Sequence, residues 1–104
     1  MMSNELDPAV AEFIDAVNAG DRDALFAVLT DDATMSDDGS ERDIADWTDK
    51  EMFSSGGRMK VESVRDNGLS LVADFTNDTW GTMRTAWRFT LAHGRISHFD
   101  TGQA

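Results

Sequence analysis

The chain has 104 residues, which is enough for one domain with one hydrophobic core. Hydrophobic residues make up 40% of it, which suffices for a globular protein. The 20 acidic residues outnumber the 9 basic ones and give a formal net charge of -11. A surface this acidic repels phosphate backbones and anionic lipids, so we expect neither nucleic acid nor a membrane as a partner. Because there is no Cys, disulfides, thiolate metal sites and Cys nucleophiles are excluded.

Neither a targeting signal nor a metal site is expected. The first residues, MMSNELDP, contain no basic segment and no hydrophobic one, and no apolar run approaches the ~20 residues of a membrane-spanning helix. We therefore expect no signal peptide and, by default, a cytoplasmic protein. The sequence has no paired His motif for zinc, and its acidic segment between Asp31 and Glu51 lacks the ligand spacing of a calcium loop. No metal and no cofactor are expected.

Two short helices joined by a sharp turn are predicted near the start of the chain. Asp7 suits the N-cap of the first helix, and Pro8 suits its first position. Gly20 fits the left-handed position that ends this helix, and Asp21 can cap the next one directly. One face of the first helix is apolar and carries Val10, Phe13, Ile14 and Val17. The second helix is predicted to run through Leu25, Phe26, Val28 and Leu29.

A brief strand and a third helix are predicted next. The acidic corner Asp31-Asp32 leads into a strand over residues 33–36, and a turn follows over residues 36–39. Ser40 with Asp43 matches a loose capping box, which predicts a third helix from Ser40. This helix carries Ile44, Trp47 and Met52 on or near one side, and the segment SSGG over residues 54–57 ends it.

From residue 58 the hydrophobic period changes from 3.6 to 2, which predicts four strands. The first covers residues 58–66 with a bulge at Ser63 and Val64, and the turn signal Asp66-Asn67-Gly68 follows it. The next two strands carry alternating apolar residues, and the last covers residues 95–101. The predicted fold is α+β in the order α-α-β-α-β-β-β-β, with three helices on one face of a mainly antiparallel sheet. A homodimer through the outer sheet face is expected, because Val64, Val72, Ala86 and Thr90 make that face less than fully polar.

Three segments carry a resemblance to a known family: NAGDRDAL, LTDDATM and the closing HGRISHFD. With the order of elements over residues 7–101, they resemble the nuclear transport factor 2-like (NTF2-like) superfamily, of the SnoaL-like kind. The resemblance implies a conical, cystatin-like α+β roll in which a curved sheet and three helices enclose a pocket open at one end. It also implies a homodimer in many cases. Known activities in the superfamily include ketosteroid isomerisation, polyketide cyclisation and epoxide hydrolysis, and numerous members have none assigned.

Ketosteroid isomerase, whose N-terminal half is similar, offers the most informative comparison within the superfamily. The resemblance places its catalytic base at Asp37, just after DDAT. The isomerase also needs two donors for the enolate oxygen, a Tyr and a protonated Asp. Phe13 stands at the Tyr position, and the Asp position falls near Ala86 or Trp87. Losing each donor costs a few kcal/mol of transition-state stabilisation, so we do not expect ketosteroid isomerase activity.

Three polar residues are candidates for acid/base catalysis. Asp37 is either a general base or a turn residue. His98 and Asp100 lie two apart on the last strand and therefore share a face. SnoaL-like cyclases resemble this in using His and Asp side chains from the strands of the roll. The sequence leaves open whether the pair faces the pocket; if Phe99 points inward, the pair lies on the outer face.

Seven apolar residues are candidates for a ligand cavity, with core packing as the alternative for each: Phe13, Val17, Phe26, Trp47, Phe75, Trp87 and Phe89. The first hypothesis is a pocket protein that binds a small apolar organic molecule without strong catalysis. The second is an acid/base isomerase or polyketide-cyclase-like enzyme that acts on a small apolar carbonyl compound. The third is a purely structural dimerisation module with a filled core.

Overall fold

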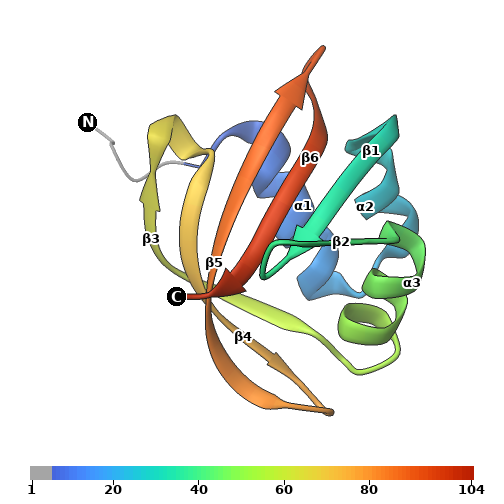
Figure 1. Cartoon of the computed structure of the whole chain (residues 1–104), viewed down its shortest axis with the longest axis vertical. Helices are drawn as coiled ribbons and strands as arrows, with labels where there is room; N and C mark the ends of the chain where they lie inside the picture. Colours follow the sequence, from blue (N-terminus) through green and yellow to red (C-terminus); the bar gives the residue numbers. More distant parts are fainter. Residues whose placement is uncertain (1–5) are drawn as a thin grey trace.

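The computed structural model describes residues 6–104, so most of the segment MMSNELDP, on which the signal-peptide expectation was based, lies outside it. Three α-helices cover one curved sheet (Figure 1). In chain order the elements are α1 (Pro8–Ala19), α2 (Arg22–Ala27), β1 (Leu29–Asp37), β2 (Ser40–Arg42), α3 (Ile44–Thr48), the π-helix η1 (Asp49–Phe53), β3 (Arg58–Arg65), the 3-10 turn η2 (Asp66–Gly68), β4 (Ser70–Asn77), β5 (Gly81–Ala92) and β6 (Arg95–Gln103). No helix within residues 6–104 is long and apolar enough to cross a membrane.

The ends of the first two helices follow the predicted capping pattern. The Asp7 carboxylate accepts a hydrogen bond of 2.9 Å from the backbone N–H of Ala9. Gly20 ends α1 with φ 67° and ψ 28°, a left-handed conformation that glycine adopts without steric cost. Asp21 caps α2 through a bond of 3.0 Å from the N–H of Ala24. These local bonds make α1 and α2 turn sharply against each other.

The second helix is shorter than predicted, and the strand after it is longer. Helix α2 ends at Ala27, and β1 begins at Leu29 rather than at residue 33. The reason lies in the sheet: the N–H of Ile96 donates to the carbonyl of Val28 at 2.8 Å, and Leu29 pairs with Ile96. Pairing with β6 therefore outweighs the helical pattern of these β-branched and aliphatic residues.

The predicted capping box at Ser40 is wrong. Asp38 and Gly39 both have positive φ, 50° and 84°, and form a tight turn between β1 and a short strand β2. Ser40 is thus the first residue of β2, paired with Asp37. The cap of α3 is Asp43, whose carboxylate accepts from the N–H of Asp46 at 3.0 Å. The sheet consequently has one more strand than expected.

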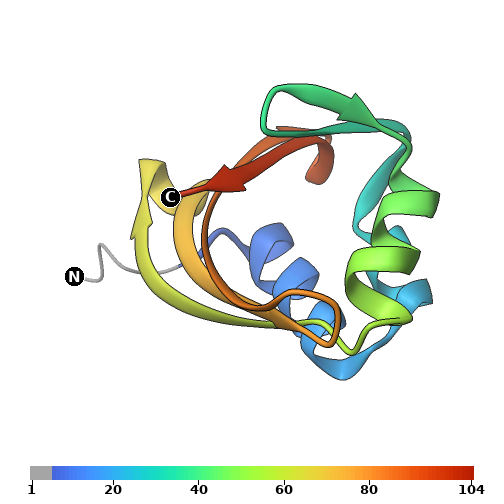
Figure 2. The same cartoon turned by 60° about the horizontal axis from the view of Figure 1, so that its bottom comes forward.

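The six strands lie in the order β2-β1-β6-β5-β4-β3. Strand β1 runs parallel to β6, and every other pair is antiparallel. The register slips between Val61 and Ser63, in agreement with the predicted bulge, and again where Ile96 and His98 of β6 face Leu91 and Thr90. The sheet bends strongly, and the helices lie on its concave side (Figure 2).

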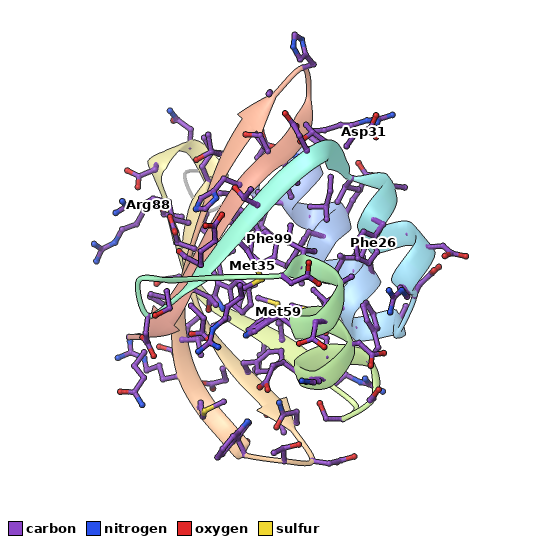
Figure 3. All side chains as sticks on the ribbon, turned by 45° about the vertical axis from the view of Figure 1, so that its right-hand side comes forward. Phe26, Asp31, Met35, Met59, Arg88 and Phe99 are labelled. Atoms are coloured by element: carbon purple, nitrogen blue, oxygen red, sulfur yellow. The ribbon has the colours of Figure 1, made fainter. Side chains whose placement is uncertain are left out.

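The core fills the inner part of the roll. Phe13 of α1 is fully buried, and its ring centroid lies 5.1 Å from those of Phe89 and Phe99. Figure 3 shows Met35, Met59 and Phe99 pointing into the space between sheet and helices, whereas Arg88 points away from it. The predicted α+β architecture, with helices packed on a curved, mainly antiparallel sheet, is confirmed.

Candidate functional site

A cavity of about 470 Å³ lies at one end of the roll, between α3 with η1 on one side and β4, β5 and the end of β6 on the other. Its wall combines an aromatic floor with a charged rim. The lining residues are Asp37, Asp38, Arg42, Asp43, Asp46, Trp47, Lys50, Glu51, Phe75, Trp80, Met83, Thr85, Trp87, Thr101, Gly102 and Gln103. The volume falls within the ordinary range of small-molecule sites.

The floor of the cavity centres on Trp87, of which only 2% is exposed. Its indole Nε1–H donates to the hydroxyl of Thr85 at 2.7 Å, and that hydroxyl donates to the carbonyl of Ala73 at 2.9 Å. The ring centroids of Phe75 and Trp47 each lie 6.2 Å from that of Trp87. Because every polar atom of the floor has a partner, the indole is held in one orientation.

Asp37 lies at the edge of this floor, at the end of β1. Its side chain is half-buried, and Oδ2 accepts a hydrogen bond of 3.1 Å from Trp47 Nε1–H. Within residues 6–104, no Lys or Arg forms an ion pair with this carboxylate. A neutral N–H orients the carboxylate without cancelling its charge. Asp37 therefore presents a negative charge to the cavity.

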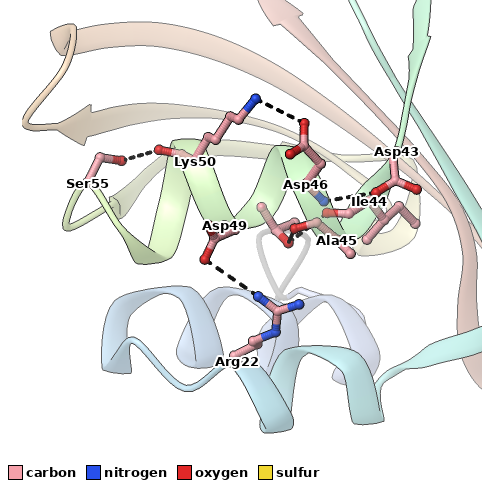
Figure 4. Close-up of polar contacts among 9 residues, drawn as sticks. Arg22, Asp43, Ile44, Ala45, Asp46, Asp49, Lys50 and Ser55 are labelled. Carbon is pink, nitrogen blue, oxygen red and sulfur yellow. Dashed lines mark hydrogen bonds and ion pairs between the residues drawn. The ribbon is translucent and has the colours of Figure 1, made fainter.

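The helical wall is braced by its own polar contacts (Figure 4). After α3 the chain widens into η1, where the N–H of Ser54 reaches back to the carbonyl of Asp49 at 2.7 Å. The Ser55 hydroxyl donates to the carbonyl of Lys50 at 2.8 Å, and Arg22 of α2 lies 3.6 Å from the Asp49 carboxylate. Single π turns inside helices are frequent at functional sites. Here the π turn carries Lys50 and Glu51 to the cavity.

The β4–β5 hairpin forms the opposite lip. Asn77 fixes its turn by accepting from the N–H groups of Thr79 and Trp80 at 3.1 and 2.8 Å. The Asn77 amide also donates to the carbonyl of Glu51 at 3.0 Å, which ties the hairpin to the π turn. Trp80, 61% exposed, lies at the lip with its apolar ring in water. The sequence analysis did not single out Trp80, although a Trp within a turn signal is an unusual pattern.

Only part of the predicted ligand-binding set lines the cavity. Trp47, Phe75 and Trp87 do, and Thr85 and Met83 join them without having been predicted. The other candidates lie elsewhere: Phe13, Val17 and Phe89 are buried in the core. Phe26 lies on α2 beneath the Arg22 guanidinium, whose Cζ is 5.2 Å from the ring centroid.

The three candidate catalytic residues are not brought together. Phe99 is fully buried on the inner face, so His98 and Asp100 lie on the outer face of the sheet. His98 Nε2 lies 2.9 Å from Asp100 Oδ1, and its Nδ1 lies 2.6 Å from the Thr34 hydroxyl. The Ser36 hydroxyl donates to Asp100 as well. This network is separated from Asp37 by the sheet.

The pKa of Asp100 lies below the ordinary aspartate value of 3.8. The main cause is the hydrogen bond from Ser36, followed by the one from His98, while partial burial opposes the shift. The guanidinium of Arg88, on the neighbouring strand, adds a smaller favourable charge. Asp100 is thus a stably ionised surface carboxylate. Among the described residues, no three His, Asp or Glu side chains are grouped closely enough to hold a metal ion.

Solved structures with the same architecture give the fold its name. A proposed polyketide cyclase from Sinorhizobium meliloti superposes with a TM-score of 0.79 at 20% identity, over 92% of this chain and 94% of that one. An NTF2-like protein from Cytophaga hutchinsonii superposes with a TM-score of 0.74 at 20% identity, over 89% of this chain and 84% of that one. This chain has the NTF2-like fold. A cystatin-fold protein from Novosphingobium aromaticivorans superposes with a TM-score of 0.72 at 16% identity, over 89% of this chain and 93% of that one.

The NTF2-like fold is the one implied by the resemblance carried by NAGDRDAL, LTDDATM and HGRISHFD. No family model and no curated protein matches the sequence. At identities of 20% or less the structural likeness concerns the fold alone, because one fold supports many unrelated activities. The function has to be argued from the cavity.

Proposed function

We propose that this NTF2-like roll, formed by the single domain predicted for residues 1–104, binds a small, largely apolar organic molecule in the cavity around Trp47 and Trp87. The observation that carries the proposal is an aromatic floor beneath a cavity of about 470 Å³ at the open end of the roll. Sites for small molecules are typically concave and mostly apolar, with a few polar groups that orient the ligand. Asp37 and Thr101 are such polar groups.

Binding without ketosteroid isomerase activity is supported by the loss of the two donors that the isomerase uses for the enolate oxygen. Phe13 has no donor and is buried in the core. The indole N–H of Trp87 is already bonded to Thr85. His98 and Asp100 lie on the other side of the sheet and have no access to a ligand in the cavity. Asp37 is thus left without the two particular donors that the isomerase pairs with its base.

The binding proposal can be tested with a neutral aromatic probe. We expect 2-naphthalenemethanol to bind wild-type protein in isothermal titration calorimetry. Met83 lines the cavity, so Met83→Trp should fill it and abolish binding. Ala45 is exposed on α3 and does not line the cavity, so Ala45→Trp is the matched control and should bind normally. Binding that survives Met83→Trp unchanged would place the ligand elsewhere. Native mass spectrometry of the purified protein would reveal a natural ligand.

The alternative is an acid/base isomerase or cyclase that acts on a small apolar carbonyl compound, with Asp37 as the base. It is favoured by a half-buried carboxylate beside the aromatic floor and by neighbours proposed to be polyketide cyclases. Exchange of the α-protons of 2-acetonaphthone in D₂O, followed by NMR, tests it. Catalysed exchange that Asp37→Asn removes would support the enzyme. Exchange at the buffer rate would count against the enzyme and leave ligand binding as the proposed function.

We also propose that the protein forms a homodimer through the outer sheet face. A row of small residues crosses three strands, since Ala86 pairs with Val72 on one side and Gly102 on the other, and a hollow of about 640 Å³ results. Arg84 and Arg88 border it together with Asp100. A face that carries both signs of charge around an apolar centre can pair with a second copy of itself.

Sedimentation equilibrium tests the dimer. Ala86→Arg places a charge in the hollow and should yield monomers, whereas Ala19→Arg, on the exposed end of α1, should not change the mass. A wild-type protein that stays monomeric at high concentration would contradict the proposal. A cytoplasmic location and the lack of nucleic-acid and membrane partners stay predictions from the sequence.

A further inference from the structure

The rim of the cavity carries an excess of negative charge. Five carboxylates and two basic side chains line the cavity, an excess of three negative charges. One of the basic groups, Lys50, pairs with Asp46 at 3.2 Å, and both side chains are well exposed. The remaining acidic groups include Asp37 at the edge of the floor. The electrostatic potential within the cavity is therefore negative.

The aromatic floor, like the negative rim, favours a positively charged ligand. Trp47, Phe75 and Trp87 surround the space, and the faces of aromatic rings attract cations through their quadrupole. The Asp37 carboxylate accepts one neutral N–H and has no ion-pair partner among residues 6–104. The charge of this group is thus available to a ligand. Asp37 and the rings together form the surroundings that an alkylammonium group attached to an apolar body requires.

We infer that the ligand is an apolar or aromatic amine in its protonated form, bound with the ring on the floor and the ammonium group at Asp37. The inference rests on the proposed function and narrows the ligand class. Neutral molecules of the same shape bind more weakly because they leave the carboxylate without a counter-charge. Anionic ones bind most weakly because the rim repels them.

Three probes of one shape and different charge test the inference: 2-naphthylmethylammonium, 2-naphthalenemethanol and 2-naphthoate. In calorimetry at pH 7 and low salt, we expect the ammonium compound to bind about tenfold tighter than the alcohol, and the carboxylate to bind more weakly than either. Raising the salt concentration should lower the affinity for the ammonium compound and leave the affinity for the alcohol almost unchanged.

Asp37→Asn keeps the acceptor for Trp47 and removes the charge. It should lower the affinity for the ammonium compound about five- to tenfold and change the affinity for the alcohol by less than about twofold. Asp15→Asn is the matched control: it removes one negative charge, as Asp37→Asn does, but Asp15 is exposed on α1 and does not line the cavity. We expect it to leave both affinities unchanged.

The possible results distinguish a failure of this inference from a failure of the proposed binding function. If the alcohol binds as tightly as the ammonium compound, the inference is overturned while the binding proposal stands. If the ammonium compound loses equal affinity in Asp37→Asn and Asp15→Asn, the effect comes from net charge and the inference is overturned too. If none of the three probes binds, both proposals fail.

Discussion

Trp47 and Asp37 are joined by a hydrogen bond of 3.1 Å, from the indole Nε1–H to Oδ2, across the cavity wall. The bond links α3 to the end of β1, the two elements that precede and follow β2 in the chain. It also orients both the aromatic ring and the carboxylate that the proposed ligand would contact. One side-chain contact therefore serves the stability of the wall and the geometry of the site.

Replacing Trp47 by Phe removes the indole N–H and keeps an aromatic ring in the wall. We expect a loss of about 1.5–3 kcal/mol in the free energy of unfolding, the usual net value of a hydrogen bond to a charged group. Urea unfolding followed by circular dichroism measures it. Trp80→Phe is the control, because Trp80 is mostly exposed and its substitution should stay within about 0.5 kcal/mol. Equal losses in the two variants would contradict the role of the bond.

Thr85 connects the floor of the cavity to the sheet. Its buried hydroxyl accepts from Trp87 and donates to Ala73, so Thr85→Val leaves the Trp87 N–H without a partner inside the core. Leaving a buried donor unsatisfied costs about 1–3 kcal/mol, and we expect the stability to fall by that amount. Thr85→Ser retains the hydroxyl and should restore most of the lost hydrogen bonding. A stable Thr85→Val variant that binds 2-naphthalenemethanol normally would refute the argument.

Gly57 is packed too tightly to accept a side chain. A Cβ atom there would lie 2.8 Å from Met52 Cα and 3.1 Å from the Phe75 ring. Because the first contact is with backbone, Gly57→Ala should displace η1 from β4 and destabilise the fold by about 1–3 kcal/mol. Thermal unfolding measures this loss. Ser54→Ala, an exposed position in the same segment, should have little effect.

The features predictable from sequence are those set by local chemistry. Asp7, Gly20 and Asp21 act on neighbouring backbone groups, so their roles as caps follow from residue type and spacing. Ser40 has an equally good local pattern but belongs to β2, because the turn at residues 38 and 39 and the pairing with Asp37 decide its conformation. The local residues fit both a helix start and a hairpin turn, and the pairing of β2 along β1 decides between them.

The site was harder to predict because it depends on long-range contacts and on one slip in register. The simple alternation of β6 groups Ile96 with His98 on one face and leaves Phe99 on the other. A bulge near Ser97 buries both Ile96 and Phe99, and His98 is therefore turned outward. Trp80 reaches the cavity because Asn77 bonds to Glu51, 26 residues earlier in the chain. No periodic pattern reports such a contact.

The hydrogen-bond network around Asp100 on the outer face of the sheet should make stability depend on pH in a defined direction. Since the folded-state pKa of Asp100 lies below its ordinary value of 3.8, folding favours the ionised form. The contribution is complete above the unfolded pKa and disappears as the pH falls through the lower folded pKa. We expect wild-type protein to be more stable than Asp100→Asn at about pH 5, and this difference to shrink below about pH 3.8. Urea unfolding between pH 3 and pH 7 measures it, with Asp15→Asn as control. A difference that grows as the pH falls would show that the hydrogen bonds from Ser36 and His98 do not favour the ionised carboxylate.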